Sequence, residues 1–272
     1  MGSASNEPLQ NEIERRSMDL DRKTLGLLTL TPPQSKRMIA EAVSIHPAVR
    51  RALEEGTIII GHGTTNSYIA AKLLGREIDE LKYSAGIIRN GELDVLPKEQ
   101  RLPAVIIRRG KELPADVDAV LLEFGHEDVL IKSGNAVDPD GVVGVLMSSR
   151  EGGTIGRSLG IIKARGAYLL MPIGLEKLIP SVPEAARYLG QDRIGVSTGE
   201  KAGLMPVVGA EVISELQALR LLAGVKATMV ASGGWGESQG SVTLSVTGQP
   251  PQVERAIQWA QYVKGRRSGR PV

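Results

Sequence analysis

Short apolar runs alternate with longer amphipathic stretches along most of the chain. The short runs are rich in Val, Ile and Leu and have the length of buried strands, while the longer stretches repeat apolar residues at helical spacing. This pattern predicts strands over residues 57–60, 104–108, 119–123, 129–131, 143–147 and 167–172, and helices over 35–44, 48–55, 65–74, 154–164 and 182–189. Interleaved strands and helices of this kind favour the α/β class, with a sheet covered on both faces.

Local signals mark the ends of several elements. The run Thr31-Pro-Pro-Gln34 has the form of a capping box with proline at the first helical position. Gly56 is placed to end the second helix in the left-handed conformation. Asn90-Gly91, inside residues 85–95, is a strong hairpin-turn signal, so we expect a β-hairpin there.

The pattern changes from about residue 204 onwards. A helix over 211–222, strands over 225–231 and 241–247 around a glycine-rich loop, and a closing helix over 250–264 form a β-α-β-β-α-like unit. Such a unit is similar to half or all of a ferredoxin-like domain. We therefore expect an N-terminal arm (1–34), in which residues 25–30 fit either an arm or an edge strand, an α/β ligand-binding domain (35–195) and an α+β ferredoxin-like domain (205–265), with a boundary between Gly190 and Pro206.

Composition narrows the classes of function. Lys plus Arg number 33 against 31 Asp plus Glu, which gives no electrostatic case for nucleic acid as the main partner. The absence of cysteine excludes disulfides and thiolate chemistry, and the three histidines are too scattered for a metal site. No apolar run reaches the roughly 18 residues that span a bilayer, and the N-terminus lacks a signal-peptide pattern. We expect a soluble cytoplasmic protein with no membrane partner, no metal and no cofactor.

A glycine-rich loop follows the predicted strand 57–60 and opens a helix: Gly61-His62-Gly63-Thr64-Thr65-Asn66-Ser67. A strand-to-helix turn places free amide N–H groups and the positive end of the helix at one point, where anions bind. Gly61 and Gly63 permit close approach of the backbone. The side chains that can donate to an anion are those of His62, Thr64, Thr65 and Ser67. This first loop predicts a phosphate or carboxylate site, against the alternative of an ordinary tight turn.

A second loop of similar form follows the apolar run 143–147 and opens the predicted helix 154–164. Its candidate ligand-binding residues are Arg150, Gly152, Gly153, Thr154 and Arg157. The two arginines suit a bidentate clamp on phosphate, although Arg150 and Glu151 also fit a surface ion pair. We expect the peptide N–H groups near Gly63 and Gly153 to converge on one anion.

Candidate carboxylates lie near the turn that follows the predicted strand 129–131. Asp138-Pro139-Asp140-Gly141 is turn chemistry, in which Asp often bonds its own backbone, but ligands of open α/β sheets gather at strand ends. Asp138, Asp140 and Glu123, at the end of the predicted strand 119–123, are therefore the candidate general acids or bases. Further candidate ligand residues are Lys132, Gly134, Asn135 and, after the predicted strand 167–172, Lys177, which alternatively pairs with Glu176 at a helix start.

The first loop, GHGTTNS, resembles the GxGTGST-like loop of ribose-5-phosphate isomerases and of the wider isomerase and CoA-transferase superfamily. The stretch VLIKSGNAVDPDG, followed by GGTIGRSLGIIKARGAYLLMPIGLEKLI, also resembles the ligand-loop pattern of methylthioribose-1-phosphate isomerase and of the related initiation-factor regulatory subunits. The resemblance covers residues 35–190. It implies a Rossmann-like open sheet whose first loop binds a sugar phosphate.

The sequence departs from those families at the acid–base position. Where the isomerases carry the aspartate of a Gly-Ala-Asp motif, Gly134-Asn135-Ala136 supplies an amide, which cannot act as a general base. The glutamate of the CoA-transferases has no clear match either, and Glu123 is the nearest candidate for it. Acid–base chemistry in this chain would therefore use Asp138, Asp140, Glu123 or Glu151.

We expect the chain to bind a small anionic metabolite of the sugar-phosphate class and, if one of these carboxylates is placed as a base, to isomerise it through an enediol. The missing aspartate favours a first alternative, a non-catalytic ligand-binding regulator on the same scaffold. An oligomeric structural protein is the second alternative. Trp235, in the glycine-rich loop 232–241, is expected to cover a ligand or to lie in a subunit contact of a homo-oligomer.

Overall fold

The computed structural model describes residues 23–265 and 270–271. These residues form two compact units. The larger unit runs from Ser35 to Ala218, and the smaller combines the described residues up to Gln34 with those from Leu219 onwards. In sequence, the larger unit is therefore inserted between the two segments of the smaller one.

A six-stranded mixed sheet forms the centre of the larger unit, in the order β12-β10-β7-β2-β5-β6. Four neighbouring strands are parallel: β2 (Thr57–Ile60), β7 (Val129–Ile131), β10 (Tyr168–Pro172) and β12 (Glu211–Ile213). The other two, β5 (Val105–Arg108) and β6 (Lys111–Glu112), continue the sheet in antiparallel pairing. Every residue of β2 and β7 is buried, as expected for strands that are covered on both faces.

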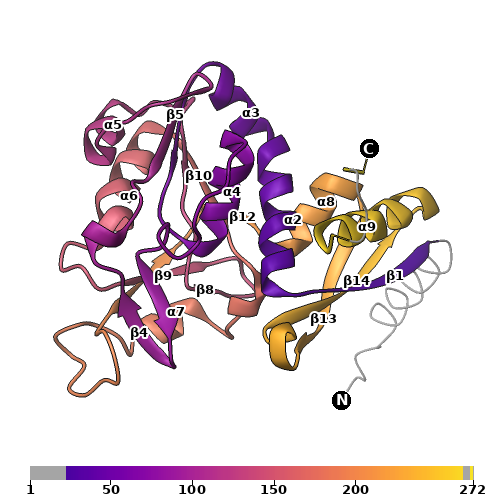
Figure 1. Cartoon of the computed structure of the whole chain (residues 1–272). Helices are drawn as coiled ribbons and strands as arrows, with labels where there is room; N and C mark the ends of the chain where they lie inside the picture. The colour runs from indigo at the N-terminus through magenta and orange to yellow at the C-terminus, as the bar shows by residue number, and fades with distance from the viewer. Residues whose placement is uncertain (1–22, 266–269, 272) are drawn as a thin grey trace, which may run out of the picture. The chain divides into compact units, whose positions relative to one another are not determined.

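Helices flank this sheet on both sides. In Figure 1, α3 (Pro47–Glu54) lies on one side, and α5 (Val117–Glu123) and α6 (Gly153–Arg165) lie on the other. The other helical segments are α2 (Pro32–Ile45), α4 (Thr64–Leu74), α7 (Val182–Ala186) and the short 3-10 turns η1 (Lys98–Gln100) and η2 (Leu175–Lys177). The α/β class predicted from the alternating pattern is confirmed.

Two small sheets complete the larger unit. Strands β11 (Gly203–Val207), β9 (Val143–Met147) and β8 (Ala136–Val137) form an antiparallel sheet in that order. Strands β3 (Gly86–Arg89) and β4 (Glu92–Val95) form a hairpin. Its turn residues Asn90 and Gly91 both have positive φ, 53° and 81°, the conformation that an Asn-Gly turn favours. The predicted hairpin is confirmed.

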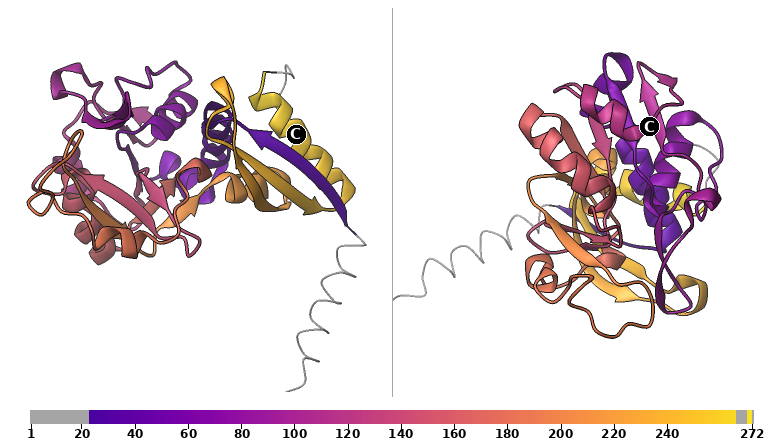
Figure 2. Two further views of the ribbon diagram at one scale, coloured as in Figure 1. Left: turned by 90° about the horizontal axis from the view of Figure 1, so that it is seen from below. Right: turned by 90° about the vertical axis from the view of Figure 1, so that its left-hand side faces the viewer.

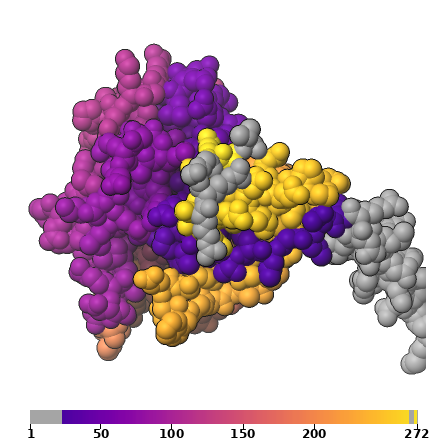
Figure 3. Space-filling view, turned by 45° about the vertical axis from the view of Figure 1, so that its right-hand side comes forward, coloured from indigo at the N-terminus to yellow at the C-terminus, as the bar shows by residue number. Residues whose placement is uncertain are grey.

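The smaller unit has a three-stranded antiparallel sheet in the order β1-β14-β13. It consists of β1 (Thr24–Leu30), β14 (Ser241–Gly248) and β13 (Lys226–Gly233), with η3 (Gly236–Ser238) in the connection between β13 and β14. The strand β1 lies along β14 (Figure 2), and α9 (Pro250–Val263) packs beside β1 (Figure 3). A Cβ added at Gly26 would lie only 2.8 Å from Val253 Cγ1, so glycine in β1 permits this close approach of α9.

Two predicted elements are wrong. Residues 119–123, predicted as a strand, belong to the helix α5. The Oδ1 atom of Asp116 accepts a hydrogen bond from the Ala119 N–H at 2.9 Å and caps that helix, which an apolar run alone does not reveal. The helix predicted over 211–222 starts later: residues 211–213 pair with β10 as β12, and α8 (Glu215–Ala223) follows.

The division between the two units also differs from the expected one. The expected boundary between Gly190 and Pro206 lies inside the larger unit, because β11 pairs with β9 and β12 pairs with β10. The smaller unit therefore does not contain β11 or β12, which lie in the range expected for the ferredoxin-like domain. Its sheet contains β1 instead, so residues 24–30 form a strand and not an arm. Residues 1–22 of the expected arm lie outside the described residues. Among the residues described, no helix is long and apolar enough to cross a membrane.

Candidate functional site

The carboxyl ends of the four parallel strands bring four loops to one edge of the larger unit's sheet. Backbone hydrogen bonds connect these loops: Gly61 N–H donates to Ile131 O at 2.9 Å, Lys132 N–H to Leu170 O at 3.0 Å, and Ile173 N–H to Ile213 O at 3.0 Å. We call residues 61–67, 132–134, 173–177 and 214–215 the carboxyl edge. Ligands of α/β sheets gather at this edge, because the loops that follow parallel strands meet there.

The first loop is held by a buried tyrosine. Gly63, at φ 154°, precedes α4 as its N-cap, and its N–H donates to the carbonyl oxygen of Tyr83 at 2.9 Å. The Tyr83 hydroxyl donates to Ile60 O at 2.6 Å and accepts from Val105 N–H at 2.9 Å. The Gly63 amide is therefore engaged, and the N–H groups that α4 offers to an anion are those of its first turn, at residues 64–66.

The polar side chains of the first loop differ in their availability. Ser67 donates from its hydroxyl to Thr64 O at 2.7 Å, so it supports the helix. Asn66 donates to Gly61 O at 2.8 Å and fixes the loop. The hydroxyl of Thr65 is buried and has no hydrogen-bond partner among the described residues. Of the hydroxyls predicted to bind an anion, that of Ser67 is already engaged, whereas that of Thr65 is unpaired.

His62 lies beside the same loop as a partly buried ring. Its Nε2 is 2.8 Å from Leu102 O, and its ring centroid is 5.6 Å from that of Tyr83. Burial lowers the pKa of His62, and the charges of Arg101 and Lys132 lower it further, against the opposing hydrogen bond to Leu102. The neutral imidazole is therefore favoured near pH 7.

Two lysines occupy the next loops of the carboxyl edge. Lys132 follows β7 and donates from Nζ to Ser133 O at 2.9 Å, and Lys177 follows β10 and donates to Gly134 O at 3.1 Å. Burial lowers the pKa of both, that of Lys132 to about 8, and the charge of Lys177 contributes to the lower pKa of Lys132. Neither ammonium forms an ion pair with a carboxylate of residues 23–265 or 270–271.

A buried serine joins the lysines to the first loop. Ser133 is 5% exposed, and its hydroxyl has no partner in the part of the chain that the structure describes. A Cβ built on Gly63 would lie 3.6 Å from Ser133 Cβ, so the serine side chain is next to the N-cap of α4. A Cβ on Gly61 would lie 3.1 Å from Lys132 Cδ. The first loop and the Lys132 loop are therefore in direct contact.

Glu215 belongs to the carboxyl edge, although the sequence did not indicate it. It is the first residue of α8, it is fully buried, and its Oε2 accepts from Leu175 N–H at 2.9 Å. Desolvation by burial raises its pKa to about 7. Lys177 is close enough for the Glu215 charge to affect its pKa. The helix predicted over 211–222 placed Glu215 in a helix interior, which concealed its position at a strand end.

The second loop does not share these contacts. It follows β9, a strand of the small antiparallel sheet, and its two arginines form exposed ion pairs: Arg150 with Asp192 at 3.0 Å and Arg157 with Asp118 at 2.9 Å. Gly152 and Gly153 have φ angles of 76° and 60° and form a tight turn into α6. Thr154 is the second residue of that helix. A shallow depression beside it is lined by Met147, Ser149, Arg150, Gly152, Gln191, Asp192 and Gly203, none of which belongs to the carboxyl edge. The predicted convergence of the two loops finds no support in these contacts.

The carboxylates and the amide of the Asp-Pro-Asp-Gly region have structural partners. Asp138 is buried; its Oδ1 accepts from Val142 N–H and its Oδ2 from Val182 N–H, both at 2.9 Å. Asn135 accepts from Leu146 N–H at 3.0 Å, and Asp140 is exposed in the turn. These residues fold the loop and do not line the carboxyl edge.

Gly134, a candidate ligand residue, is required for packing. A Cβ at this position would lie 2.2 Å from Val143 Cγ1 and 2.9 Å from Gly144 O, so no larger residue fits between β7 and the small sheet. Its carbonyl oxygen nevertheless accepts from Lys177. Gly134 thus contributes to the carboxyl edge through its carbonyl oxygen, and its lack of a side chain serves packing.

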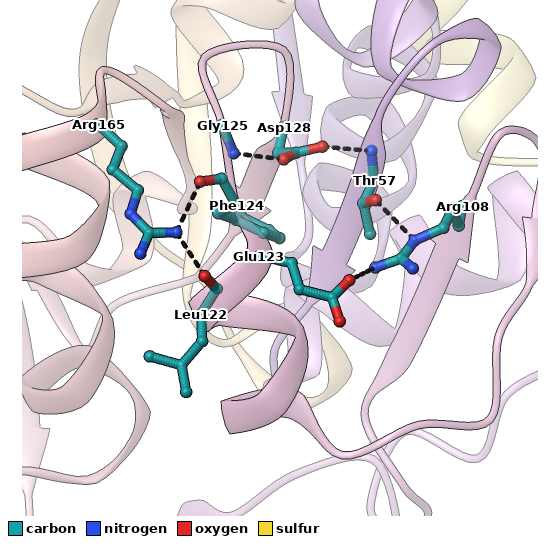
Figure 4. Close-up of polar contacts among 8 residues, drawn as sticks. All are labelled: Thr57, Arg108, Leu122, Glu123, Phe124, Gly125, Asp128 and Arg165. Atoms are coloured by element: carbon teal, nitrogen blue, oxygen red, sulfur yellow. Dashed lines mark hydrogen bonds and ion pairs between the residues drawn. The ribbon is translucent and has the colours of Figure 1, made fainter.

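Glu123 lies at the opposite edge of the sheet. It ends α5 and accepts from Arg108 at 2.6 Å, and Arg108 also donates to the hydroxyl of Thr57, the first residue of β2 (Figure 4). Asp128 accepts from the N–H groups of Thr57 and Gly125, both at 2.6 Å. Glu123 is therefore separated from Gly61 by the length of β2, and the expected strand-end position at the ligand loops is wrong.

Trp235 belongs to the smaller unit, and its side chain is 90% exposed. In the larger unit, the carboxyl edge combines two desolvated lysines, free N–H groups of a helix end, unpaired hydroxyls and a carboxyl group whose pKa is near neutrality. Groups of this kind bind anions and transfer protons.

Comparisons with protein-family models, with curated proteins and with solved structures gave no significant match to this chain.

Proposed function

We propose that the carboxyl edge binds a small phosphorylated metabolite of the sugar-phosphate class. The observation that carries this proposal is the pair of lysines, Lys132 and Lys177: the charge of Lys177 contributes to the lowered pKa of Lys132, and neither ammonium forms an ion pair with a carboxylate among the described residues. The carboxylates of Glu176, Glu215 and Glu80 act on Lys177, but no carboxylate of the described residues contributes to the pKa of Lys132, so a desolvated ammonium at Lys132 is unfavourable without a further counter-charge. A phosphate dianion supplies that charge and accepts hydrogen bonds from both lysines.

The backbone of α4 supports the choice of an anion. The N–H groups of its first turn carry the positive end of the helix, and the unpaired hydroxyls of Thr65 and Ser133 lie beside them. This proposal includes the finer description of the fold, a Rossmann-like sheet of the isomerase and CoA-transferase type, because such sheets place phosphates at the loop after a parallel strand.

Binding without turnover is the second candidate function, that of a ligand-binding regulator. It is favoured by two observations: Asp138 has backbone partners on both carboxylate oxygens, and Glu123 lies at the other edge of the sheet. Isomerisation would then need a different proton carrier, for which Glu215, a buried carboxyl group of the carboxyl edge with a pKa raised to about 7, is a candidate. Proton exchange from ribose 5-phosphate into deuterated water, followed by NMR, distinguishes the candidates, because isomerisation through an enediol can exchange the proton next to the carbonyl group and binding alone cannot.

Thermal unfolding with ribose 5-phosphate, inorganic phosphate and unphosphorylated ribose tests the proposal. At a hundredfold excess over its dissociation constant, a ligand adds about 2.7 kcal/mol to the free energy of unfolding. We expect stabilisation by the two phosphates and none by ribose. The variants Lys132→Met and Lys177→Met should lose most of this stabilisation.

The matched control is Lys163→Met. Lys163 is exposed on α6 and donates to Gly209 O at 2.7 Å, so its removal changes the net charge equally but leaves the carboxyl edge intact. Stabilisation by phosphate should persist in this variant. Equal loss in all three lysine variants would show that only net charge matters, and no stabilisation of the unsubstituted chain by any phosphate would overturn the proposal.

A further inference from the structure

We propose that Lys132 is a nucleophile that condenses with the aldehyde or ketone group of its ligand to form an imine. This inference rests on the proposed function, because the carboxyl edge first has to hold the phosphate of the same molecule. It narrows the ligand class to phosphorylated metabolites that carry a carbonyl group. It also assigns a chemical role to a residue that sequence patterns indicated only as a phosphate ligand.

The position of Lys132 suits this reaction. It follows β7, which lies between β2 and β10, so its side chain has a ligand loop on either side. The side chain passes along the first loop at Gly61 and is half-buried. Among the residues that the structure describes, its Nζ has one hydrogen bond, to Ser133 O at 2.9 Å, and no carboxylate partner that would hold it as an ammonium ion.

The environment of Lys132 favours the unprotonated amine, which is the reactive form. Burial, together with the charge of Lys177, lowers its pKa to about 8. At pH of about 7.5, about a quarter of such amines are unprotonated, against about a thousandth for a lysine of ordinary pKa. Desolvation and a neighbouring cation are two ways in which proteins activate lysine as a nucleophile.

Other charged groups also act on this pair of lysines. His62 faces Lys132 from the first loop, and the lowered pKa of the histidine keeps it largely uncharged. Glu176, Glu215 and Glu80 act on Lys177 from three different segments and favour its ammonium form, whereas Lys36 opposes them. For Lys177, burial lowers the pKa and the three carboxylates offset part of that lowering, whereas for Lys132 burial and the charge of Lys177 together lower the pKa to about 8.

The condensation is balanced without an oxidant or a cofactor. The Lys132 nitrogen attacks the carbonyl carbon, a C–N bond forms, and the carbonyl oxygen takes up a proton to give a carbinolamine. The C–O bond then breaks, the oxygen leaves as water with a second proton, and the C=N bond remains. The amine nitrogen gives up two protons in these steps, which balance the two that the oxygen takes up. The hydroxyl of Ser133, which has no other partner among the described residues, can donate a hydrogen bond to the departing oxygen.

Reductive trapping tests the imine directly. The full chain is incubated with dihydroxyacetone phosphate and sodium borohydride, and the adduct is located by intact mass and peptide mapping. We expect one adduct, on Lys132, whose rate of formation rises with pH through about 8. The compound sn-glycerol 3-phosphate has the same phosphate but no carbonyl; it should stabilise the protein, give no adduct and protect Lys132 from labelling.

Variants separate this inference from the proposed function. Lys132→Arg should abolish the adduct, and the exposed control Lys163→Arg should retain it. Lys177→Gln should keep the adduct on Lys132 but move the rise in labelling to higher pH, because a neighbouring charge is removed. If Lys132→Arg fails to fold, the peptide map of the unsubstituted chain still decides which lysine reacts.

Three results would overturn one or both proposals. Labelling spread over exposed lysines in proportion to their exposure would overturn the imine. Stabilisation by both phosphates with no adduct would overturn the imine and leave phosphate binding intact. Neither stabilisation nor adduct would overturn both.

Discussion

The buried carboxyl group of Glu215 gives the most informative test of the electrostatics of the carboxyl edge. Burial raises its pKa from the ordinary 4.5 to about 7. Between these two pH values the folded chain holds the proton more tightly than the unfolded chain does, so the free energy of unfolding falls as pH rises. At about 1.4 kcal/mol for each pKa unit, the stability lost above pH 7 is about 3 kcal/mol.

Replacement by glutamine should remove this dependence. Glu215→Gln keeps the shape of the side chain and an oxygen for the Leu175 N–H but cannot ionise. Because the carboxylate also favours the nearby Lys177 ammonium, which glutamine cannot do, we expect a net gain of about 2 kcal/mol at pH 8. The gain should shrink to below about 1 kcal/mol at pH 5, where the folded carboxyl group is already protonated.

Urea unfolding measured between pH 5 and pH 8 provides the assay. The two tryptophans of the chain, Trp235 and Trp259, both belong to the smaller unit, so fluorescence follows that unit while circular dichroism follows both. The effect of Glu215→Gln should therefore be seen in circular dichroism. Glu184→Gln, at an exposed site of α7, is the control and should change stability by less than about 0.5 kcal/mol at both pH values. A variant that is less stable than the unsubstituted chain at pH 8, or that keeps its pH dependence, would refute the reasoning.

Two further substitutions test structural roles. Asp138→Asn leaves one of two backbone N–H donors without an acceptor, so it should lower the free energy of unfolding in urea by about 1 to 3 kcal/mol. The control Asp140→Asn, at an exposed position, should change this free energy little. Loss of phosphate binding by Asp138→Asn at unchanged stability would instead place Asp138 in the site. Gly26→Val forces a side chain against Val253 of α9 and should lower the free energy of unfolding of the smaller unit by about 1 to 3 kcal/mol. Urea unfolding followed by tryptophan fluorescence measures this change. An unchanged unfolding transition would contradict the close packing of β1 against α9.

The sequence predicted the buried strands well because their signal is local. Residues 57–60, 129–131 and 143–147 have the same bounds as β2, β7 and β9. Each is a short run dominated by apolar residues, with glycine or polar residues next to it. The run 119–123 has the same appearance but forms a helix, and the distinguishing feature is the cap at Asp116, which lies outside the run.

The sequence predicted those site residues whose position depends on a single strand and the loop that follows it. The first loop, Lys132 and Lys177 were indicated by their positions after predicted strands, and the structure places them at one edge. The second loop has the same local pattern, yet it follows β9, which pairs with β8 and β11 and not with β7. Which loops meet depends on strand order, and the sequence of one chain carries no local signal for that.

Glu215 shows the same limit for single residues. Its burial depends on β12 joining the sheet beside β10 and on the η2 turn passing over it, where Leu175 donates to its carboxylate. Both features arise from segments about forty residues apart in the chain. In the predicted helix 211–222, Glu215 resembles any glutamate in the interior of an amphipathic helix, where charged residues usually face solvent.

The two edges of the larger unit's sheet differ in a way that bears on function. At the amino edge the charges have partners: Arg108 pairs with Glu123, Asp128 accepts two backbone N–H groups, and Arg165 donates to two carbonyl oxygens (Figure 4). At the carboxyl edge the two lysines, like Arg165, donate only to carbonyl oxygens within the described residues, but here the charge of one lysine also lowers the pKa of the other. The ion pair and the paired carboxylate at the amino edge stabilise the fold, whereas the two lysines without an ion pair at the carboxyl edge do not. A local loss of stability of this kind is expected where a chain keeps charged groups available for a ligand. The unpaired cations, not the glycines that first suggest an anion site, are therefore the stronger argument for binding at this edge.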